Sequence, residues 1–429
     1  MRIVPSLLAA ACCLAAAAAQ AAAPPPPAPL RLTLSQALAR ARAYSPQFQA
    51  ALAAEGIARD NRAIAHAALL PSLTLNNNYI WTQDNIYVAN DGPHEFVTLG
   101  DVHQNFNFAL GPALKQAGAG ALLARAQAQI AQRGLRAAVT ADFYTLLADR
   151  HKVATARQAL ADAQNYLKVS REREQGGEVA HADVIQAELQ LEQSQSALRQ
   201  AQLLQRQAKL ALAVLLFRDL NLNFALADDL GQAPPLPPLR RIQALAALRN
   251  PIVASAQAQL EEARQGVKIA RAALLPSFSL DYFYGMDAHE YALYNQYHQF
   301  NLGNSVMGML SIPVFHWGAN RARVHQAQAV QRQAQVQLSY TQRQLLAALQ
   351  SDYAAAQAAH DELALLARSR ALAAESLRLV GLRYRDGEAT ILELVSAQLA
   401  NTAARNAYND GEVRYRVALA TLQTLTGVF

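Results

Sequence analysis

The sequence predicts a mainly α-helical chain of two similar halves, in which long antiparallel helix pairs continue into the strands of a membrane β-barrel. Three observations support this prediction: the sequence repeats, each repeat switches from helical to strand periodicity, and each contains helices far longer than a compact domain needs. The peptide AALLPS marks the switch at 67–72 and again at 272–277, 205 residues later. Composition agrees, since the chain is rich in alanine and only 16% of it is charged, as in closely packed helices.

The N-terminal segment has the pattern of an export signal. Arg2 is followed by an apolar stretch, and small residues before a run of prolines offer a cleavage site after about Ala21 or Ala23. We therefore assign 1–23 to a signal peptide and 24–30 to a proline-rich linker. The signal directs the mature chain out of the cytoplasm.

The two cysteines, Cys12 and Cys13, both fall within this signal segment. A lipoprotein acylated at Cys12 is the competing interpretation. The stretch before Cys12 is short for a lipoprotein signal, and Ala9 stands where a leucine is usual. The sequence favours plain cleavage, which leaves a mature chain without cysteine and hence without disulfides or thiol chemistry.

The repeat is much larger than six residues. Without a gap, 45–75 aligns with 250–280, and further on 177–189 aligns with 387–399 at a spacing of 210 residues. Self-similarity of this kind indicates duplication of one structural unit. The chain accordingly divides into a first repeat, a proline-rich inter-repeat segment and a second repeat, at 31–217, 218–239 and 240–429.

Each repeat is expected to contain one β-hairpin, at about 72–112 in the first and about 277–314 in the second. Apolar and polar residues alternate in both, beginning with Leu73, Thr74 and Leu75. One apolar face, one small polar face and aromatic residues toward one end are typical of strands between lipid and water. A soluble β-sandwich would alternate in the same way, so the strand pattern alone leaves both open.

Prolines accompany the joints between helix and strand. Pro71 and Pro276 disfavour helical geometry at the preceding leucine and lack an N–H group. The helix is therefore expected to stop there and an extended segment to begin. Pro112 and Pro313 are assigned to the return joints, where each hairpin passes back into a helix.

After each hairpin the chain runs without proline from about 118 to 174 and from about 318 to 384. At 1.5 Å per residue such helices are rods of roughly 85–100 Å. Apolar residues recur every seven positions along the first rod and predict a coiled-coil seam: Val139, Leu146, Val153, Leu160 and Leu167. Each rod is expected to turn at glycine, at 176–177 and at 387, with a second helix running back.

Four strands in one chain do not close a barrel, because about eight are the usual minimum. An open sheet would leave unpaired backbone groups in lipid, each at a cost of several kcal/mol. Several chains must therefore contribute strands to one barrel. Three chains would make twelve strands, with the long helices continuing the wall, although the strand pattern does not itself choose three.

The sequence argues against several other classes of protein. Beyond the signal, the best candidate for a membrane-spanning helix, 210–217, is too short to cross a bilayer. The net charge of +6 is spread along the chain without a basic block, so no nucleic-acid partner is expected. Nucleotide-binding, hydrolase and zinc-protease motifs are absent, so neither an enzyme activity nor a cofactor is expected.

A metal site is not expected either. The histidines near the hairpin tips are too scattered for a ligand set: His94, His103, His289 and His298. Packing between strands accounts better than copper handling for three methionines: Met286, Met307 and Met309.

Four features together resemble the TolC-like outer membrane efflux proteins: the duplicated halves, the LPS joints, LSIPVFHWGANRARVHQA opening the second rod, and RYRDGEATILELVSAQ at its turn. The resemblance covers about 32–427. It implies a homotrimer in the outer membrane of Gram-negative bacteria, with a twelve-stranded barrel in outer-membrane lipid on a long periplasmic α-helical tunnel. Such proteins export drugs, metals or polypeptides and catalyse no reaction. The implied partners are a periplasmic adaptor (membrane fusion) protein and an inner-membrane pump such as an RND or ABC transporter.

The alternative function is a periplasmic coiled-coil scaffold or adaptor without a barrel. An adaptor would show one helical hairpin flanked by soluble β domains, rather than two equal halves that each carry an amphipathic strand pair. The two functions are distinguished by whether the protein is embedded in the membrane, as a channel would be, or soluble, as a scaffold would be. For an export channel, the choice of cargo usually lies with the pump and the adaptor.

The resemblance places pore closure and adaptor contact at the two turns. The turn and adaptor-contact residues are Gly176, Gly177, Glu178, Gly387 and Glu388. Positions matched to the gate or selectivity ring are Asp183, Tyr384 and Glu393. The chain departs from the best-known member at Ala389, which replaces a helix-linking arginine, and at Ser396, which replaces a second acid. We therefore expect a different latch, through Arg383 or Arg385.

Glu393 also has a structural interpretation. Thr390 and Glu393 have the spacing of a capping box, in which Thr390 caps the returning helix and Glu393 bonds back to it. Asp183, at the same place in the first repeat, would favour the helix N-terminus through the helix dipole. If several copies of Glu393 line one narrow axis, their charges add and disfavour anions. The two roles are compatible.

Overall fold

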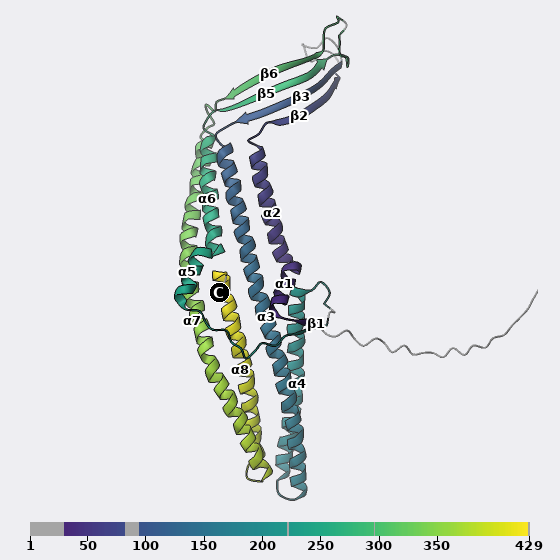
Figure 1. Cartoon of the computed structure of the whole chain (residues 1–429), viewed down its shortest axis with the longest axis vertical. Coiled ribbons are helices and arrows are strands. Elements are labelled where there is room, and N and C mark those ends of the chain that lie inside the picture. The colour runs from purple at the N-terminus through teal and green to yellow at the C-terminus, as the bar shows by residue number, and fades with distance from the viewer. Residues whose placement is uncertain (1–29, 82–93, 221–222, 296, 428–429) are drawn as a thin grey trace, which may run out of the picture.

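The computed structural model describes residues 30–81, 94–220, 223–295 and 297–427. The assigned signal peptide and Cys12 lie outside these residues. The described chain is an elongated rod of helices with a four-stranded sheet at one end (Figure 1). None of its described helices is long and apolar enough to cross a membrane.

The same succession of long elements occurs twice along the chain. The first set is β1 (Leu30–Leu32), α1 (Leu34–Tyr44), α2 (Pro46–Ala67), β2 (Ser72–Trp81), β3 (His94–Phe106), α3 (Leu110–Gln175) and α4 (His181–Leu216). The second set is β4 (Phe224–Leu226), α5 (Leu239–Arg249), α6 (Pro251–Ala272), β5 (Ser277–Ala288), β6 (Leu302–Ser311), α7 (Ala319–Arg385) and α8 (Ile391–Thr426).

The rod is built around two helices, α3 with 66 residues and α7 with 67. At 1.5 Å per residue each is about 100 Å long, as the sequence predicted. In the half near the sheet the helices lie side by side in the order α2, α3, α6, α7, and in the far half in the order α4, α3, α8, α7 (Figure 1). The heptad seam of α3 is confirmed, since Val139, Leu146, Val153 and Leu167 are buried and Leu160 is half-buried.

The helices that lead into the sheet begin with strong caps. Asn250 precedes Pro251 of α6, and its Oδ1 accepts hydrogen bonds from the N–H groups of Ile252 at 2.9 Å and Val253 at 3.1 Å. Ser45 caps α2 with a single, longer bond, in which its Oγ accepts from the N–H of Phe48 at 3.4 Å. Both helices end before the joint prolines, and a short turn leads to the strand that begins directly after Pro71 or Pro276.

The return joint of the first repeat differs from the prediction. α3 begins at Leu110, not at about 118, so Pro112 lies in the first turn of the helix and not in the joint. A proline is tolerated there because the N–H groups of a first turn have no helical partner. The joint itself is 107–109, where Asn107 Oδ1 accepts hydrogen bonds from the N–H groups of Ala109 and Leu110. Pro313 does lie in the second return joint, between β6 and α7.

The two hairpins form one antiparallel sheet in the order β2, β3, β5, β6. Residues opposite one another in register share a face, so Leu73, Val102 and Tyr282 lie together on the apolar side. Each of the three is exposed in the single chain. The strands at the two edges, β2 and β6, each pair with one strand among the described residues.

The inter-repeat segment crosses the middle of the rod and is fastened to α8. Tyr415 donates its hydroxyl proton to Pro234 O at 2.6 Å, and the buried carboxylate of Glu412 accepts a hydrogen bond from Gly231 N at 2.6 Å. Close by, β1 pairs in parallel with β4, which joins the start of the first repeat to the inter-repeat segment. The largest apolar cluster packs beneath them, around Phe143 and Tyr144 of α3.

Arg133 ties α3 to the ends of two helices of the second repeat. Its guanidinium donates to the carbonyl oxygens of Thr424 at 3.0 Å and Arg249 at 2.9 Å, and burial lowers its pKa. In Arg133→Met both carbonyls lose a charged donor, so we expect unfolding to become easier by about 2–3 kcal/mol. Thermal unfolding in detergent measures the loss. Arg157→Met, at an exposed position of the same helix, is the control and should unfold like the parent; equal loss in both variants would contradict the assignment.

Candidate functional site at the helical tip

Two turns between helices lie at the end of the rod farthest from the sheet (Figure 1). Main-chain hydrogen bonds close the first of these turns. After α3 ends at Gln175, Gly177 adopts a φ of +74°. The N–H of Glu178 donates to Arg173 O at 2.9 Å, which closes a Schellman motif. The positive φ explains why glycine stands at this position.

The second turn repeats this geometry. α7 ends at Arg385, Gly387 has a φ of +82°, and the N–H of Glu388 donates to Arg383 O at 2.8 Å. The side chains of Glu178 and Glu388 are exposed at the two turns. The sequence repeat therefore corresponds to a structural repeat at the tip, down to individual hydrogen bonds.

The cap at the start of α8 is confirmed in one of its two halves. Thr390 Oγ1 accepts a hydrogen bond from Glu393 N at 3.3 Å. The Glu393 carboxylate lies 3.7 Å from the guanidinium of Arg383 instead of bonding back to Thr390. With its side chain half exposed, Glu393 is available to solvent on the surface that also carries Ser396.

Asp183 occupies the corresponding place in the first repeat. It lies in the first turn of α4, half-buried, with its N–H donating to Ala180 O at 3.0 Å. Ala180 precedes the helix and offers no side-chain cap. The negative charge of Asp183 therefore supports the N-terminus of α4 through the helix dipole.

The two candidate latch arginines point to different partners. Arg383 donates to Glu388 O at 3.0 Å and faces Glu393, so its contacts stay within the second helix pair. Both members of the Arg383–Glu393 pair are about half exposed, and such a pair contributes about 0–1 kcal/mol. Arg385 acts instead on Tyr166 of α3. Burial and the nearby Asp162 raise the pKa of Tyr166 to about 12, and the positive charge of Arg385 opposes this rise.

A link between the two helix pairs at the tip is made by Tyr384, whose side chain is buried. Its hydroxyl lies 2.6 Å from Ser170 Oγ of α3, and both groups are shielded from solvent. Arg173 of α3 donates to Tyr384 O at 3.1 Å and places its guanidinium over the tyrosine ring, 5.4 Å from the centroid. We call Ser170, Arg173 and Tyr384 the tyrosine latch.

The position of Ala389 accounts for why the arginine that links the two helix pairs comes from the first pair. Ala389 is buried in an apolar cluster that joins the two turns, and the cluster also contains Leu167, Val184, Ala187, Tyr384, Ile391, Leu394 and Val395. A charged side chain at 389 would be desolvated within this cluster. The cross-link is instead made by Arg173, which reaches Tyr384 from the first helix pair.

Sequence reasoning missed both Ser170 and Arg173. Arg173 had a signal, because it precedes Gly177 by the same four residues that separate Arg383 from Gly387. Ser170 had none, since the residue 210 positions later is Val380. Its partner is 214 residues away along the chain, so only the packed structure brings the two together.

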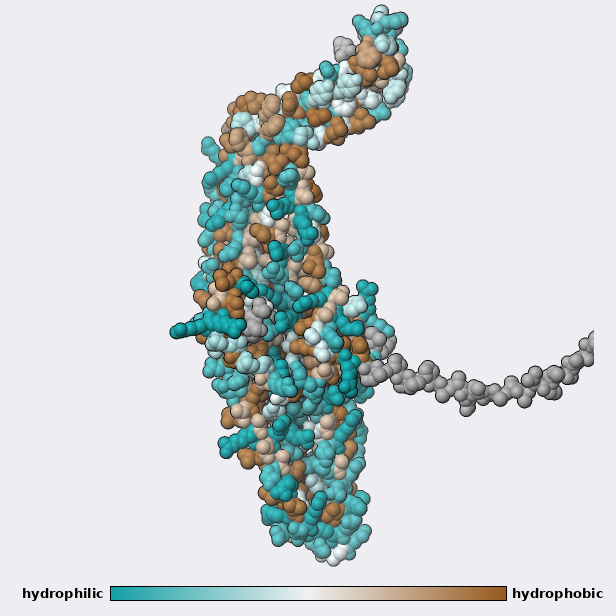
Figure 2. Space-filling model, viewed as in Figure 1, coloured by the Kyte–Doolittle hydropathy of each residue, from teal (hydrophilic) through white to brown (hydrophobic). Residues whose placement is uncertain are grey.

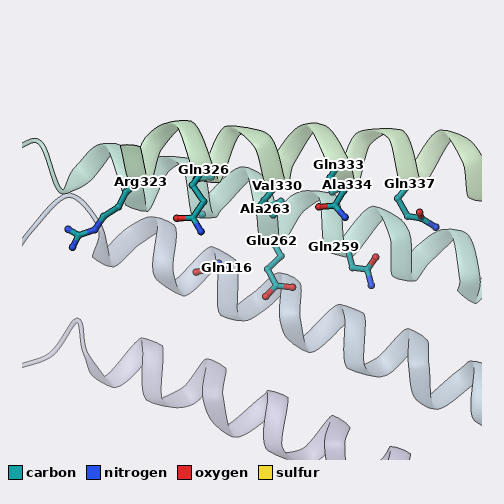
Figure 3. A pocket seen from close by; sticks show the side chains of 12 residues that line it. Gln116, Gln259, Glu262, Ala263, Arg323, Gln326, Val330, Gln333, Ala334 and Gln337 are labelled. Carbon is teal, nitrogen blue, oxygen red and sulfur yellow. The ribbon is translucent and has the colours of Figure 1, made fainter. Parts of the chain in front are cut away.

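A polar groove lies nearer the sheet, over α3 and between α6 and α7 (Figure 3). It has a volume of about 510 Å³, and its lining includes the charged residues Glu262 and Arg323. Five glutamines make up most of its polar lining: Gln116, Gln259, Gln326, Gln333 and Gln337. Amide side chains both donate and accept hydrogen bonds without carrying charge. Such a wall is suited to contact with water or a polar surface, and its described lining offers no serine, cysteine or histidine nucleophile.

Solved structures share this architecture. The outer membrane channel CmeC of Campylobacter jejuni is 18% identical with a TM-score of 0.80, over 92% of this chain and 85% of that one. The outer membrane protein VceC of Vibrio cholerae is 19% identical with a TM-score of 0.77, over 92% and 96%. The outer membrane channel MtrE of Neisseria gonorrhoeae, in its open state, is 21% identical with a TM-score of 0.73, over 92% and 89%. No curated protein matches the chain in sequence.

The fold is thus shared with outer membrane channels, with strands at one end and long helices at the other. The family model for outer membrane efflux proteins matches residues 37–216 and 243–428, and the chain belongs to this family. The resemblance predicted from the sequence is confirmed. With it are confirmed the location in the outer membrane, the periplasmic helical tunnel and the function as an export channel, within a family of transport proteins.

Proposed function

We propose that three copies of this chain form one continuous duct, with a twelve-stranded barrel in the outer membrane and a helical tunnel that closes at the periplasmic tip. The unpaired edges of the sheet support this proposal most directly. Among the described strands, β2 and β6 each pair on one side only, although both lie in the membrane end of the molecule. Pairing β6 of one copy with β2 of the next removes every free edge, which lipid requires.

The helical part has matching free edges. On the outermost helix α7, leucines at heptad spacing are exposed: Leu365, Leu372 and Leu379. On the opposite outermost helix, α4, exposed leucines also fall at multiples of seven: Leu189, Leu203 and Leu210. Apolar seams of this period are typical of helices that pack side by side. We infer that α7 of one copy packs against α4 of the next.

The tip is then the narrow end of the duct. The tyrosine latch holds the two helix pairs of one copy together, and we assign it to the closed state of the gate. Asp183 and Glu393 are assigned to the pore lining, and the exposed turn residues, with Glu178 and Glu388, to contact with a periplasmic adaptor. The adaptor connects the duct to an inner-membrane pump such as an RND or ABC transporter.

Size and membrane behaviour test the duct. The full-length protein is extracted from outer membranes with detergent, and its mass is measured by light scattering. A particle of three chains that needs detergent to stay dispersed supports the proposal. A monomer or dimer released without detergent would contradict it and favour the periplasmic scaffold.

Ion selectivity tests the role of Glu393. In Glu393→Gln we expect the preference for cations over anions to fall on the order of threefold, because one charge per copy is removed from the narrow axis. The cap that Thr390 Oγ1 makes uses the main-chain N–H of residue 393, which glutamine retains, so the fold is kept. Reversal potentials in a KCl gradient across planar bilayers measure the change.

The matched control for this variant is Glu375→Gln. Glu375 pairs with Arg378 at 2.7 Å on α7, about 15 Å from the tip. It should leave the reversal potential unchanged. If Glu393→Gln also leaves it unchanged, the carboxylate serves the helix end alone and not the pore.

A further inference from the structure

The two return joints between sheet and helices differ in length. In the first repeat, 107–109 connects β3 to α3, whereas in the second repeat the seven residues 312–318 connect β6 to α7. The longer joint, which we call the joint segment, contains an apolar group that the shorter one has no room for: Val314, Phe315 and Trp317.

These side chains are held outward. Val314 is 90% exposed, Phe315 67% and Trp317 91%. The rings of Phe315 and Trp317 meet edge to face, with their centroids 5.0 Å apart. Trp317 has a φ of +50°, a left-handed conformation that is unfavourable for a bulky side chain. A strained backbone that presents an aromatic pair to solvent indicates contact with something outside the chain.

The joint segment lies where the apolar face of the sheet meets the periplasmic helices. Ile312, which is 58% exposed, continues the alternation of Val306 and Leu310 on the apolar side of β6. Figure 2 shows hydrophobic residues gathered at this bend of the molecule. In a barrel this level corresponds to the lipid headgroups, where tryptophan is enriched because its ring is both apolar and polar.

The charges beside the joint segment are positive. Residues 291–351 contain no aspartate or glutamate. Arg321 and Arg323, in the first turns of α7, are exposed, as is Arg271 in the last turn of α6. Asn320 donates to Ala273 O at 3.2 Å and so holds the two helix ends together. Arginines at this level are suited to the phosphate groups of anionic lipids.

We propose that the joint segment anchors each chain in the periplasmic leaflet of the outer membrane. Val314, Phe315 and Trp317 enter the boundary between headgroups and acyl chains, and Arg271, Arg321 and Arg323 bind the phosphates of anionic phospholipids. The inference rests on the proposed barrel, which sets the level of the membrane. It names a lipid contact that the trimer itself does not require.

Tryptophan fluorescence tests the anchor, because the chain has only two tryptophans, Trp81 and Trp317. In Trp81→Phe, reconstituted into phosphatidylcholine vesicles and recovered by flotation, emission comes from Trp317 alone. We expect blue-shifted emission, weak quenching by acrylamide, and stronger quenching by lipids brominated near the headgroup than by lipids brominated near the chain end. Flotation with the vesicles, checked first, keeps failure of the barrel distinguishable from failure of the anchor.

Two outcomes in the floated protein would overturn the anchor. Strong acrylamide quenching without bromine quenching would place Trp317 in water. Blue-shifted emission that neither quencher affects would place it against a neighbouring copy of the chain.

The headgroup contact is tested on the same preparation by exchanging part of the phosphatidylcholine for phosphatidylglycerol. Phosphatidylglycerol retained by the purified protein is quantified against phosphatidylcholine by mass spectrometry. Arg321→Gln and Arg323→Gln are each expected to lower the ratio roughly fivefold. Arg332→Gln, an exposed arginine about 16 Å further along α7 than Arg321, is the control and should not change it. Equal ratios in all three variants and the parent would overturn the phosphate contact.

Discussion

Gly285→Ala is expected to prevent the two hairpins from joining into one sheet. A Cβ atom at Gly285 would clash with Thr98 O and lie 2.8 Å from Leu99 Cα, and both atoms belong to the main chain of β3. The β3–β5 ladder, which joins the two repeats in the membrane, would have to separate to admit it. We expect a loss of about 3 kcal/mol or more, seen as loss of detergent-extracted oligomer and of heat-resistant sheet by circular dichroism.

The residue opposite provides a matched control. Gly303 of β6 is the register partner of Gly285 across the β5–β6 ladder, yet an added Cβ there meets nothing within 4 Å. Gly303→Ala should therefore fold and extract like the parent. Equal loss in both variants would mean that the sheet rejects any side chain at this level, and would remove the special role of the β3–β5 approach.

Structural features that depend on local periodicity, such as strand starts and the helix seam, were predictable from the sequence. The prolines at 71 and 276 and the change from helical to alternating patterns located the starts of β2 and β5 at the correct residues. The seven-residue spacing from Val139 to Leu167 predicted the buried seam of α3. Such signals depend on neighbours a few residues apart, and distant parts of the chain reinforce them without altering them.

The start of α3 was predicted too late because Pro112 was assigned to the joint and not to the first turn of the helix. Two glycines also follow Pro112 near this end of the helix. Gly118 and Gly120 are poor helix formers, and each costs about 1 kcal/mol relative to alanine. In the structure α3 passes through both, since it packs along its length against α2 and α6. Tertiary packing outweighs two glycines in a helix of 66 residues.

The tyrosine latch was out of reach for a different reason. The turn geometry, including Gly177 and Gly387, follows from residues close in sequence. The Ser170–Tyr384 contact depends instead on how α3 packs beside the second helix pair, and its members are 214 residues apart. The sequence led to Arg383 and Arg385 because it shows which charges are near the turn, but not which side chain faces the neighbouring helices.

Tyr384→Phe is expected to favour the open state of the proposed gate. The substitution keeps the ring that Arg173 covers but leaves the buried hydroxyl of Ser170 without its partner. An unsatisfied buried hydroxyl costs about 1–3 kcal/mol, so we expect the ratio of open to closed channels to rise roughly tenfold. Single-channel recordings in planar bilayers measure this ratio directly. Tyr340→Phe, at an exposed tyrosine of the same helix, is the control and should record like the parent.

The double variant Ser170→Ala with Tyr384→Phe separates a lost hydrogen bond from a general loosening of the tip. Replacing both partners by apolar groups leaves no buried polar atom unpaired, so the closed state should recover much of its stability compared with Tyr384→Phe alone. A leaky single variant and a tighter double variant would establish the pair as part of the latch. If Tyr384→Phe conducts like the parent while its fold and oligomer are intact, the pair holds the tip together without controlling opening. The two exposed arginines of this turn, Arg383 and Arg385, would then remain as candidates for the gate.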